Sequence, residues 1–474
     1  MSTSRTGGDA IVIPRRAWVV LALVSFGQMM TTFAGSALNV GFGVIEEDLG
    51  VERTTLVWAI SGYAIAAAAF LLIAGRIADR IGGKRIFLSG MSLFTLGSLA
   101  AAVAPNAELL IAGRVVQGLG SAAMIPSSLS IALQEFPRER RSLAVGAWGG
   151  VAAIAGASGP PVGAALIELW SWRLVFIVVI PIGVAIVVVG SRILRDPPRT
   201  ASSGRLDIIS GPLASIAVGL VIVALLQSPI WGWDDPRVVG SLLMAPLLIG
   251  LLLWRSATHP TPLIDLSLFA NRRFVLASAT TTGYNAATAG YWLAAPLFLQ
   301  SVWGWGVLAS GLAIAPGPIV HLMLAGPTGR LADRGVHREL MIAGTFISAL
   351  GTGGLALFVT EDSTYWLTVL PFTIAMGLGG AFAWPVFTSA ALVDIEPEQL
   401  GEANGINLTM RQLGAATGVA VVIAVVGNGS NAGPDAFRLA WLIGTIGLLA
   451  CTATLVWAFP RRSYVHATST APGS

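Results

Sequence analysis

Two arginines stand inside long apolar stretches of this chain, Arg114 and Arg411. A guanidinium in hydrocarbon costs several kcal/mol unless it is paired or faces water, so each arginine marks a candidate functional site. Arg114 could bind an anion or modulate a proton carrier; alternatively, it extends to the nearer membrane surface along its aliphatic stem. Arg411 lies close to the middle of its stretch, and the alternative there is a structural pairing with backbone carbonyls.

His321 is a further titratable group in an apolar stretch. A free imidazole titrates at about pH 6.5, which suits a proton switch. The alternative is a histidine whose nitrogens are satisfied within a helical core. Acidic side chains that could carry protons are few, and they lie near the ends of apolar stretches: Glu46, Glu47, Asp48, Glu168 and Glu402.

A short charged segment occurs twice, as "AGRIADRIGGKR" (74–85) and "TGRLADRGVHR" (328–338). Its aspartate can accept hydrogen bonds from a basic side chain or a helix N-terminus, and its glycines permit a tight turn and close helix approach. We interpret the segment as a gate latch; alternatively, its basic residues only signal membrane topology. The candidate gate residues are Gly75, Asp79, Arg80, Gly82, Lys84, Arg85, Asp333 and Arg334.

Polar side chains at helical spacing predict a pathway through the membrane. Gln28, Thr32 and Asn39 share one face of the first apolar stretch, and Asn285 lies on a similar face later in the chain. A polar stripe on an apolar membrane helix faces protein or water rather than lipid. For each aromatic ring in the pathway, ordinary packing is an equal alternative. The predicted pathway residues are Gln28, Thr32, Asn39, Tyr63, Arg114, Gln117, Asn285, His321, Trp384 and Arg411.

The tripeptide Gly159-Pro160-Pro161 lies in the middle of the fifth apolar stretch. Proline removes a backbone hydrogen bond and clashes with the preceding turn, so we expect the helix to bend or unwind locally. A bent face of small residues suits a hinge or a seal between helices, and a static kink is the alternative.

The elements that must position these residues are membrane helices. Of 474 residues, 55% are hydrophobic and 11% charged, whereas about a quarter of the residues in soluble domains are charged. We identify fourteen apolar stretches long enough to cross a bilayer, which takes about 20 helical residues. The sequence therefore predicts an all-α integral membrane protein with 14 transmembrane helices.

Several classes of protein are disfavoured. One cysteine, Cys451, provides neither a disulfide framework nor a metal cluster. The 4 histidines are scattered and form no catalytic set, and the sequence has no Walker-A phosphate loop. We therefore expect no enzymatic activity, no cofactor, no metal and no nucleic-acid partner.

The basic residues predict the orientation. If the N-terminus is cytoplasmic, most of the 28 lysines and arginines fall in the tails and in the loops on that side. This is the positive-inside pattern, and an even number of helices places both termini in the cytoplasm. The loop "DIEPEQ" (394–399) departs from it, because it carries acids and no arginine.

The charged segment belongs to a longer internal repeat. Gly75 recurs as Gly329, 254 residues later, and "GLGSAAMIPSSLSIAL" from Gly118 recurs as "GLGGAFAWPVFTSAAL", 259 residues later. We therefore predict two pseudo-symmetric six-helix bundles with a helix pair inserted between them. The expected parts are a cytoplasmic tail (1–16), the N-terminal bundle (17–195), the inserted pair (207–257), the C-terminal bundle (274–460) and a second cytoplasmic tail (461–474).

The motifs together resemble the major facilitator superfamily, specifically its fourteen-span drug:proton antiporters. The segment 74–85 is similar to that family's loop between helices 2 and 3, and "RVVQGLGSA" to its helix-4 motif. "GPPVG" resembles the antiporter motif of helix 5 through Gly159, Pro160 and Gly163. One departure is Ala34, which stands where the branch commonly has an acid in helix 1.

The resemblance implies a secondary transporter of the bacterial cytoplasmic membrane that works as a monomer. It would export amphipathic drugs or antibiotics in exchange for protons, by alternating access. The alternative is a facilitator or flippase for a lipid or metabolite, with weak or no proton coupling. Ala34 favours neutral or anionic substrates over cations. The implied partners are a small amphipathic substrate, protons and the lipid bilayer.

Overall fold

The computed structural model of the protein describes residues 13–38, 42–51, 53–137, 140–196, 209–259, 262, 264–332, 334–362, 364–396, 399–426 and 433–460. Within these residues the chain forms helices and no strand. The elements are α1 (Arg15–Ala37), α2 (Phe42–Leu49), α3 (Arg53–Ile81), α4 (Gly83–Ala102), α5 (Ala107–Glu135), α6 (Arg141–Leu169), α7 (Leu174–Ile177), α8 (Val179–Ile193), α9 (Ser210–Trp231), α10 (Pro236–Thr258), η3 (Leu266–Ala270), α11 (Arg272–Ser301), α12 (Val307–Ile314), α13 (Pro316–Ala332), α14 (His337–Phe358), α15 (Tyr365–Thr368), α16 (Leu370–Leu392), α17 (Leu400–Val426) and α18 (Pro434–Trp457).

The helices confirm the predicted all-α class and the presence of many helices that can cross a membrane. Among the described residues, 11 helices are long and apolar enough to cross a membrane. Several side chains of α3 and α6 lie outside the described part of the structure, and the apolar runs found in these helices are Gly62–Leu71 and Leu143–Gly156. Helix α11 falls outside the set although it contains 30 residues. Helix α11 carries many threonines and glycines, which suit a helix surrounded by protein rather than lipid. The count of 14 spans stays a prediction.

Prolines divide some apolar stretches into two helices. Pro316 follows the break between α12 and α13, and Pro371 follows the break between α15 and α16. A proline fits the first turn of a helix, where its missing N–H would have no partner in any case. The second helix of each pair therefore begins beside its proline.

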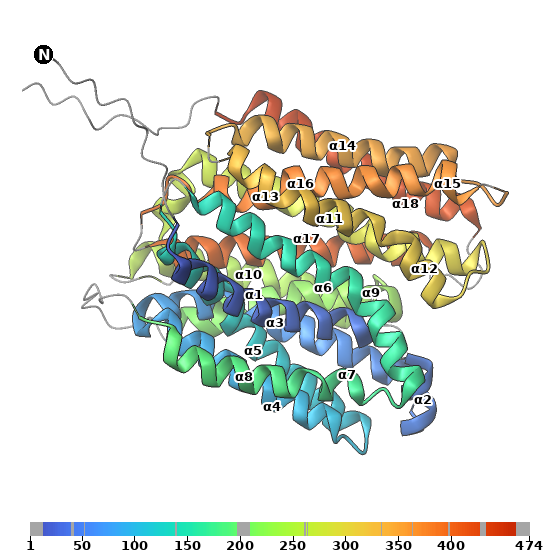
Figure 1. The fold of residues 1–474 in the computed structure, drawn as a ribbon, viewed down its shortest axis with the longest axis horizontal. Helices are drawn as coiled ribbons and strands as arrows, with labels where there is room; N and C mark the ends of the chain where they lie inside the picture. The colour runs from blue at the N-terminus through green and yellow to red at the C-terminus, as the bar shows by residue number, and fades with distance from the viewer. Residues whose placement is uncertain are drawn as a thin grey trace, which may run out of the picture.

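Figure 1 shows the helices in two groups that lie side by side with nearly parallel axes. The first group contains α1 to α8 and the second group contains α11 to α18. The short helices α2, α7, α12 and α15 all lie at one end of the molecule, at the right of the view, and α1 begins at the opposite end. We call these the α2 end and the α1 end.

Glycines bring helices close together within each group in the same way. A Cβ atom on Gly90 of α4 would lie 2.7 Å from the carbonyl oxygen of Gly120 in α5. In the second group, a Cβ atom on Gly344 of α14 would lie 2.8 Å from the carbonyl oxygen of Gly379 in α16. Both pairs need glycine because backbone meets backbone. Their members are 254 and 259 residues apart in the sequence, the same offsets as in the internal repeat.

Helix α9 packs against both groups. The Ser215 hydroxyl donates a hydrogen bond to the Ala69 carbonyl of α3 at 2.8 Å. Ile222 of α9 shares a small apolar cluster with Ala68 of α3 and Ala416 of α17. Helix α10 packs on α9 and exposes large apolar side chains. The α9–α10 pair therefore lies beside the junction of α3 and α17 and offers an apolar outer face to lipid.

Residues at and next to the acidic loop 394–399 form specific contacts with the region around the start of α11. Asp394 forms an ion pair with Arg273 at 3.3 Å. The Gln399 amide donates to the Asp265 carboxylate at 2.7 Å, and the Glu402 carboxylate accepts the backbone N–H of Asp265. These contacts tie the start of α17 to the segment before α11. Asp394 thus has a local partner in Arg273, which gives this acid a structural role in the loop.

Asp48 joins α2 to the start of α7. Its carboxylate accepts hydrogen bonds from Arg173 at 2.6 Å and from the Trp172 indole at 2.9 Å. The hydrogen bond from Arg173, followed by the one from Trp172, lowers the pKa of Asp48. A carboxylate with a lowered pKa stabilises the folded state above the pKa of the unfolded chain, and this stabilisation disappears as the pH falls through the folded pKa.

We therefore expect Asp48→Asn to reduce the thermal stability at neutral pH but not in acid. The loss should be at most about 1 kcal/mol, because the pair is partly exposed to solvent. The difference in Tm between wild type and variant should disappear as the pH falls through the lowered pKa of Asp48. Asp435→Asn is the matched control, since Asp435 is 91% exposed in its pair with Arg438. An unchanged Tm for Asp48→Asn at pH 7 would contradict the expectation.

Candidate functional site

Gly75, the first glycine of the repeated charged segment, lies against the opposite group of helices. A Cβ atom on Gly75 of α3 would lie 2.7 Å from the carbonyl oxygen of Gly401 and 3.6 Å from the Cα atom of Gly405, both in α17. Real Cβ atoms essentially never lie within 3.0 Å of a heavy atom in a non-neighbouring residue. Only glycine at this position therefore lets α3 and α17 approach so closely.

Gly329, the repeat copy of Gly75, lies in the corresponding contact. A Cβ atom on Gly146 of α6 would lie 2.7 Å from the carbonyl oxygen of Ala325 and 3.8 Å from the Cα atom of Gly329, both in α13. Both contacts lie toward the α1 end of the molecule (Figure 1). We call Gly75, Gly146, Gly329 and Gly401 the gate glycines.

The rest of the first charged segment is tied to α8. Gly82 adopts φ 107°, a conformation that favours glycine. The Lys84 backbone N–H donates to the Asp196 carboxylate at 2.9 Å, and its ammonium group donates to the Ser191 carbonyl at 2.7 Å. Arg85 is exposed. These contacts fix the turn within the first group.

The predicted gate latch depends on Asp79 and Asp333. The structure does not describe the side chains of these two aspartates, so the latch is not tested. The side chains of Asp79 and Arg80 lie outside the described part of the structure, and so does residue Asp333. Arg334 is described and exposed to solvent. The latch stays a prediction, while the glycines of the same segment have a defined place between the groups.

Arg114 is held by backbone carbonyls in the centre of the first group. Its Nε donates to the Ala59 carbonyl at 3.0 Å, and its Nη1 donates to the Ala34 carbonyl at 3.2 Å and to the Gln117 amide oxygen at 2.8 Å. Gln117 donates in turn to the Ser98 hydroxyl at 2.7 Å. The Arg114 side chain is fully buried, so it does not extend to the membrane surface.

Tyr63 completes this network on the side of α3. The Arg114 guanidinium lies 4.3 Å from the centre of the Tyr63 ring, an attractive cation–π arrangement. The Tyr63 hydroxyl lies 3.2 Å from both the Thr31 carbonyl and the Ser121 hydroxyl. Ala34, which stands in place of the acid expected from the family resemblance, thus contributes a carbonyl oxygen to Arg114.

Two of the three polar residues predicted on α1 lie together. The Gln28 amide donates to the Thr32 hydroxyl at 3.3 Å. A Cβ atom on Gly156 of α6 would lie 3.6 Å from the Thr32 methyl group, so this face of α1 meets α6. Asn39 lies outside the described residues.

A second cluster lies in the other group and contains His321, Trp384 and Arg411. The Arg411 guanidinium lies 4.4 Å from the centre of the Trp384 ring. The ring centres of His321 and Trp384 are 5.9 Å apart and the rings meet edge to face. A Cβ atom on Gly149 of α6 would lie 3.7 Å from the Trp384 ring. Trp384 therefore sits where the second group meets the first.

Asn285 is not part of that cluster. Its amide donates to the Thr281 carbonyl of its own helix at 2.8 Å, and the side chain is buried. The neighbouring Tyr284 hydroxyl pairs with the Ser348 hydroxyl at 3.3 Å. The polar face of α11 is thus bonded within the second group.

The proline motif leaves α6 helical. Helix α6 continues from Arg141 to Leu169 through Gly159 and the two prolines, so the expected local unwinding is not seen. A Cβ atom on Gly163 would lie 2.7 Å from the Ala37 carbonyl oxygen of α1. Gly163 therefore permits close packing of α6 on α1, within one group. The side chain of Pro160 lies outside the described residues.

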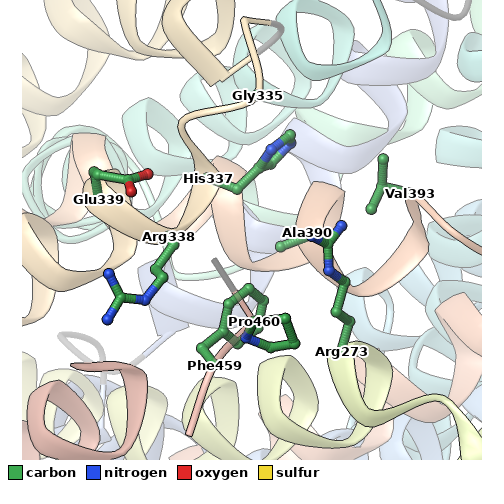
Figure 2. A pocket seen from close by; sticks show the side chains of 9 residues that line it. All are labelled: Arg273, Gly335, His337, Arg338, Glu339, Ala390, Val393, Phe459 and Pro460. Atoms are coloured by element: carbon green, nitrogen blue, oxygen red, sulfur yellow. The ribbon is translucent and has the colours of Figure 1, made fainter. Parts of the chain in front are cut away.

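Two cavities lie away from these clusters. Figure 2 shows a cavity of about 10 Å³ at the start of α14, where His337 and Arg338 lie near Phe459. This volume is about that of one water molecule and is too small for a drug-sized ligand. A groove of about 830 Å³ at the α2 end is lined by aromatic residues, Trp303, Trp305, Tyr365 and Trp366 among them. Such aromatic residues are typical of the membrane–water interface.

Three glycines of the two gate contacts escaped the sequence-based prediction. Gly146, Gly401 and Gly405 were not singled out, although Gly401 and Gly405 have the small-xxx-small spacing of close membrane-helix contacts. That spacing could have indicated a close helix contact at Gly401 and Gly405. It could not have identified the helix that packs there, because the partner depends on tertiary packing.

The whole chain matches one family of membrane transporters. The sequence profile of the Major Facilitator Superfamily matches residues 24–320 and 274–473. The chain is 30% identical over 441 residues to the methylenomycin A resistance protein of Bacillus subtilis (strain 168), covering 93% of this chain and 94% of that protein. It is 27% identical over 407 residues to the riboflavin transporter RibZ of Clostridioides difficile (strain 630), covering 86% and 87%.

A solved structure shows the same fold. The proton:xylose symporter XylE matches with a TM-score of 0.68 at 12% identity, covering 95% of this chain and 97% of that chain. The sequence profile, the relatives and the fold agree over nearly the full length of the chain. The chain therefore belongs to the Major Facilitator Superfamily, and it is a multi-pass membrane transporter whose relatives include antibiotic resistance proteins.

Proposed function

We propose that the protein exports amphipathic drugs or antibiotics across the bacterial cytoplasmic membrane in exchange for protons, by alternating access. The observation that carries this proposal is the pair of backbone contacts made by the gate glycines. Each contact joins the two groups of helices at the same end, and the two contacts are related by the internal repeat. Relatives named for antibiotic resistance support export as the direction of transport.

The proposed architecture has fourteen spans. The first group (17–195) and the second group (274–460) form two six-helix bundles, and the α9–α10 pair (207–257) is inserted between them. The glycine contacts at offsets of 254 and 259 residues support the repeat, and the packing of α9 on both groups supports a separate role for the pair. The chain works as a monomer in this proposal.

The gate glycines give the transport cycle a physical basis. Interfaces between packed helices have a few discrete arrangements rather than a continuous range. When the gate glycines touch, the pathway is closed at the α1 end. When the bundles separate there, the pathway opens to the cytoplasm, because the positive-inside pattern places the α1 end on that side.

A facilitator for a metabolite is the second candidate. Ala34 removes the acid that the related antiporters commonly carry in helix 1, and one relative is named as a riboflavin transporter. A facilitator would move its substrate down its own gradient. It would not respond to a pH gradient.

Uptake into inverted membrane vesicles distinguishes the two candidates. We expect an imposed pH gradient, acidic inside, to drive uptake of some compounds from a panel of cationic, neutral and anionic amphipathic drugs. Asp79→Asn should abolish this uptake while the protein is still inserted in the membrane. Uptake of compounds without any dependence on the pH gradient would replace proton exchange with facilitated transport.

A further inference from the structure

Arg411 carries a charge near the middle of a membrane-crossing helix, and no acidic side chain among the described residues pairs with it. It follows eleven residues after the start of α17, which runs from Leu400 to Val426. Its guanidinium makes no hydrogen bond or ion pair with any residue in the part of the chain that the structure describes. A charge at this depth is costly unless something compensates for it, and such residues mark substrate or ion pathways.

The environment of Arg411 places it inside the molecule and away from lipid. One side of α17 packs on α11, where a Cβ atom on Gly414 would lie 2.2 Å from the Thr282 carbonyl oxygen. A second side, at Ala416, faces α3 and α9. Arg411 faces Trp384 of α16, and that ring also meets α6 of the first group. The guanidinium therefore lies near the junction of the two groups.

Arg114 has the same side chain and a different environment. Three hydrogen bonds occupy its Nε and Nη1 atoms, it is fully buried, and only Nη2 lacks a partner among the described residues. Arg411 is half-buried, and its donors have no hydrogen-bond partner among the described residues, so they can pair with a ligand. A guanidinium binds carboxylate, sulfonate and phosphate groups through two parallel hydrogen bonds. Arg411 is thus the better placed of the two to bind an anion.

The ring of Trp384 beside Arg411, and the ring of His321 beside Trp384, suit the rest of an amphipathic molecule. Trp384 offers an aromatic surface next to the charge. His321 is 7% exposed and lies edge to face with Trp384, and its Nε2 atom has no hydrogen-bond partner among the described residues. Drug-sized sites combine apolar and aromatic walls with a few polar groups of this kind.

We propose that Arg411, Trp384 and His321 form the subsite that selects anionic aromatic substrates. The acidic group of the substrate pairs with Arg411, its ring lies against Trp384, and His321 supplies a further hydrogen bond. This assignment deepens the proposed export function and rests on it. It also accounts for an uncompensated arginine at mid-membrane depth, because the substrate brings the missing charge.

Binding of two matched probes tests the subsite separately from transport. The probes are 8-anilinonaphthalene-1-sulfonate and N-phenyl-1-naphthylamine, which share a skeleton and differ in the sulfonate. Equilibrium dialysis uses the full-length protein in lipid nanodiscs, with empty nanodiscs subtracted. We expect the sulfonate probe to bind wild type more tightly than the neutral probe. Arg411→Gln should weaken sulfonate binding about 10- to 100-fold, the range for a charge-assisted pair, and change neutral-probe binding less than about twofold.

Controls keep the outcome decisive. Arg237→Gln removes an exposed arginine in the first turn of α10 and should leave both affinities unchanged. Trp384→Ala should weaken both probes. If Arg411→Gln weakens both probes equally, or neither, the subsite is wrong. If Arg411→Gln does not fold, Arg411→Lys takes its place. The lysine ammonium group is a point charge without the planar guanidinium, so this variant should bind the sulfonate probe several-fold more weakly than wild type. An unchanged affinity for the sulfonate probe would overturn the proposal.

Failure of the proposed function has a different signature. If no pH gradient drives uptake of either probe while sulfonate binding still depends on Arg411, proton exchange fails and the subsite stands. If the gradient drives uptake of both probes equally and binding ignores Arg411, the exporter stands and the subsite fails.

Discussion

Replacing Gly75 with alanine is expected to lower the rate of transport at least about tenfold, while the protein still folds. The added Cβ atom would lie 2.7 Å from the Gly401 carbonyl oxygen, a backbone atom that cannot rotate away. The strain is relieved only if α3 and α17 move apart. Because these helices belong to different groups, the change should destabilise the closed state at the α1 end and leave the packing within each group intact. A shift of about 1.4 kcal/mol in this equilibrium corresponds to a factor of ten.

Transport and distance measurements check this expectation together. The single cysteine, Cys451, is buried, so a Cys451→Ala background accepts spin labels at the exposed positions Ile81 and Val393. Gly75→Ala and Gly146→Ala should both lengthen the distance between the labels and slow the uptake into vesicles. Gly326→Ala is the matched control on α13, because nothing lies within 4 Å of its Cβ position. Equal transport by Gly75→Ala and Gly326→Ala would show that the glycine contact does not control the gate.

Replacing Arg114 with glutamine is expected to reduce the free energy of unfolding by about 3–5 kcal/mol. The guanidinium satisfies the Ala34 and Ala59 carbonyls and the Gln117 amide in a fully buried site. A shorter side chain loses these hydrogen bonds, and a hydrogen bond that involves a charged group contributes about 1.5–3 kcal/mol. The loss of the contact with the Tyr63 ring adds to this cost.

The stability of the Arg411→Gln variant provides the comparison for Arg114→Gln. Both arginines are placed inside membrane helices, but Arg411 has no hydrogen-bond partner among the described residues. Thermal unfolding in detergent should therefore show a large fall in Tm for Arg114→Gln and a small change for Arg411→Gln. A stable Arg114→Gln protein with altered substrate preference would instead place Arg114 in the binding site.

The helices themselves are local properties of the sequence. A run of about 20 apolar residues becomes a membrane helix because its backbone groups must be satisfied within the segment. The repeat at Gly75 and Gly329 is likewise visible in the sequence, because both copies of the charged segment keep the same residue types at the same spacing. The effect of the two prolines in α6 was not predictable in this way, because neighbouring helices can accommodate prolines without unwinding the helix.

What the sequence alone determined about this protein is its class and its family, because apolar length and motif spacing are read along the chain. The placement of the arginines predicts its orientation. Only the tertiary structure decided which residues act together. Gly75 meets Gly401 across more than 300 positions, and Arg114 meets carbonyls of two other helices. The two arginines look alike in sequence, yet one is bonded to the backbone and the other has no hydrogen-bond partner in the part of the chain that the structure describes. That difference arises from the atoms that surround each guanidinium, and those atoms come from helices distant in the chain.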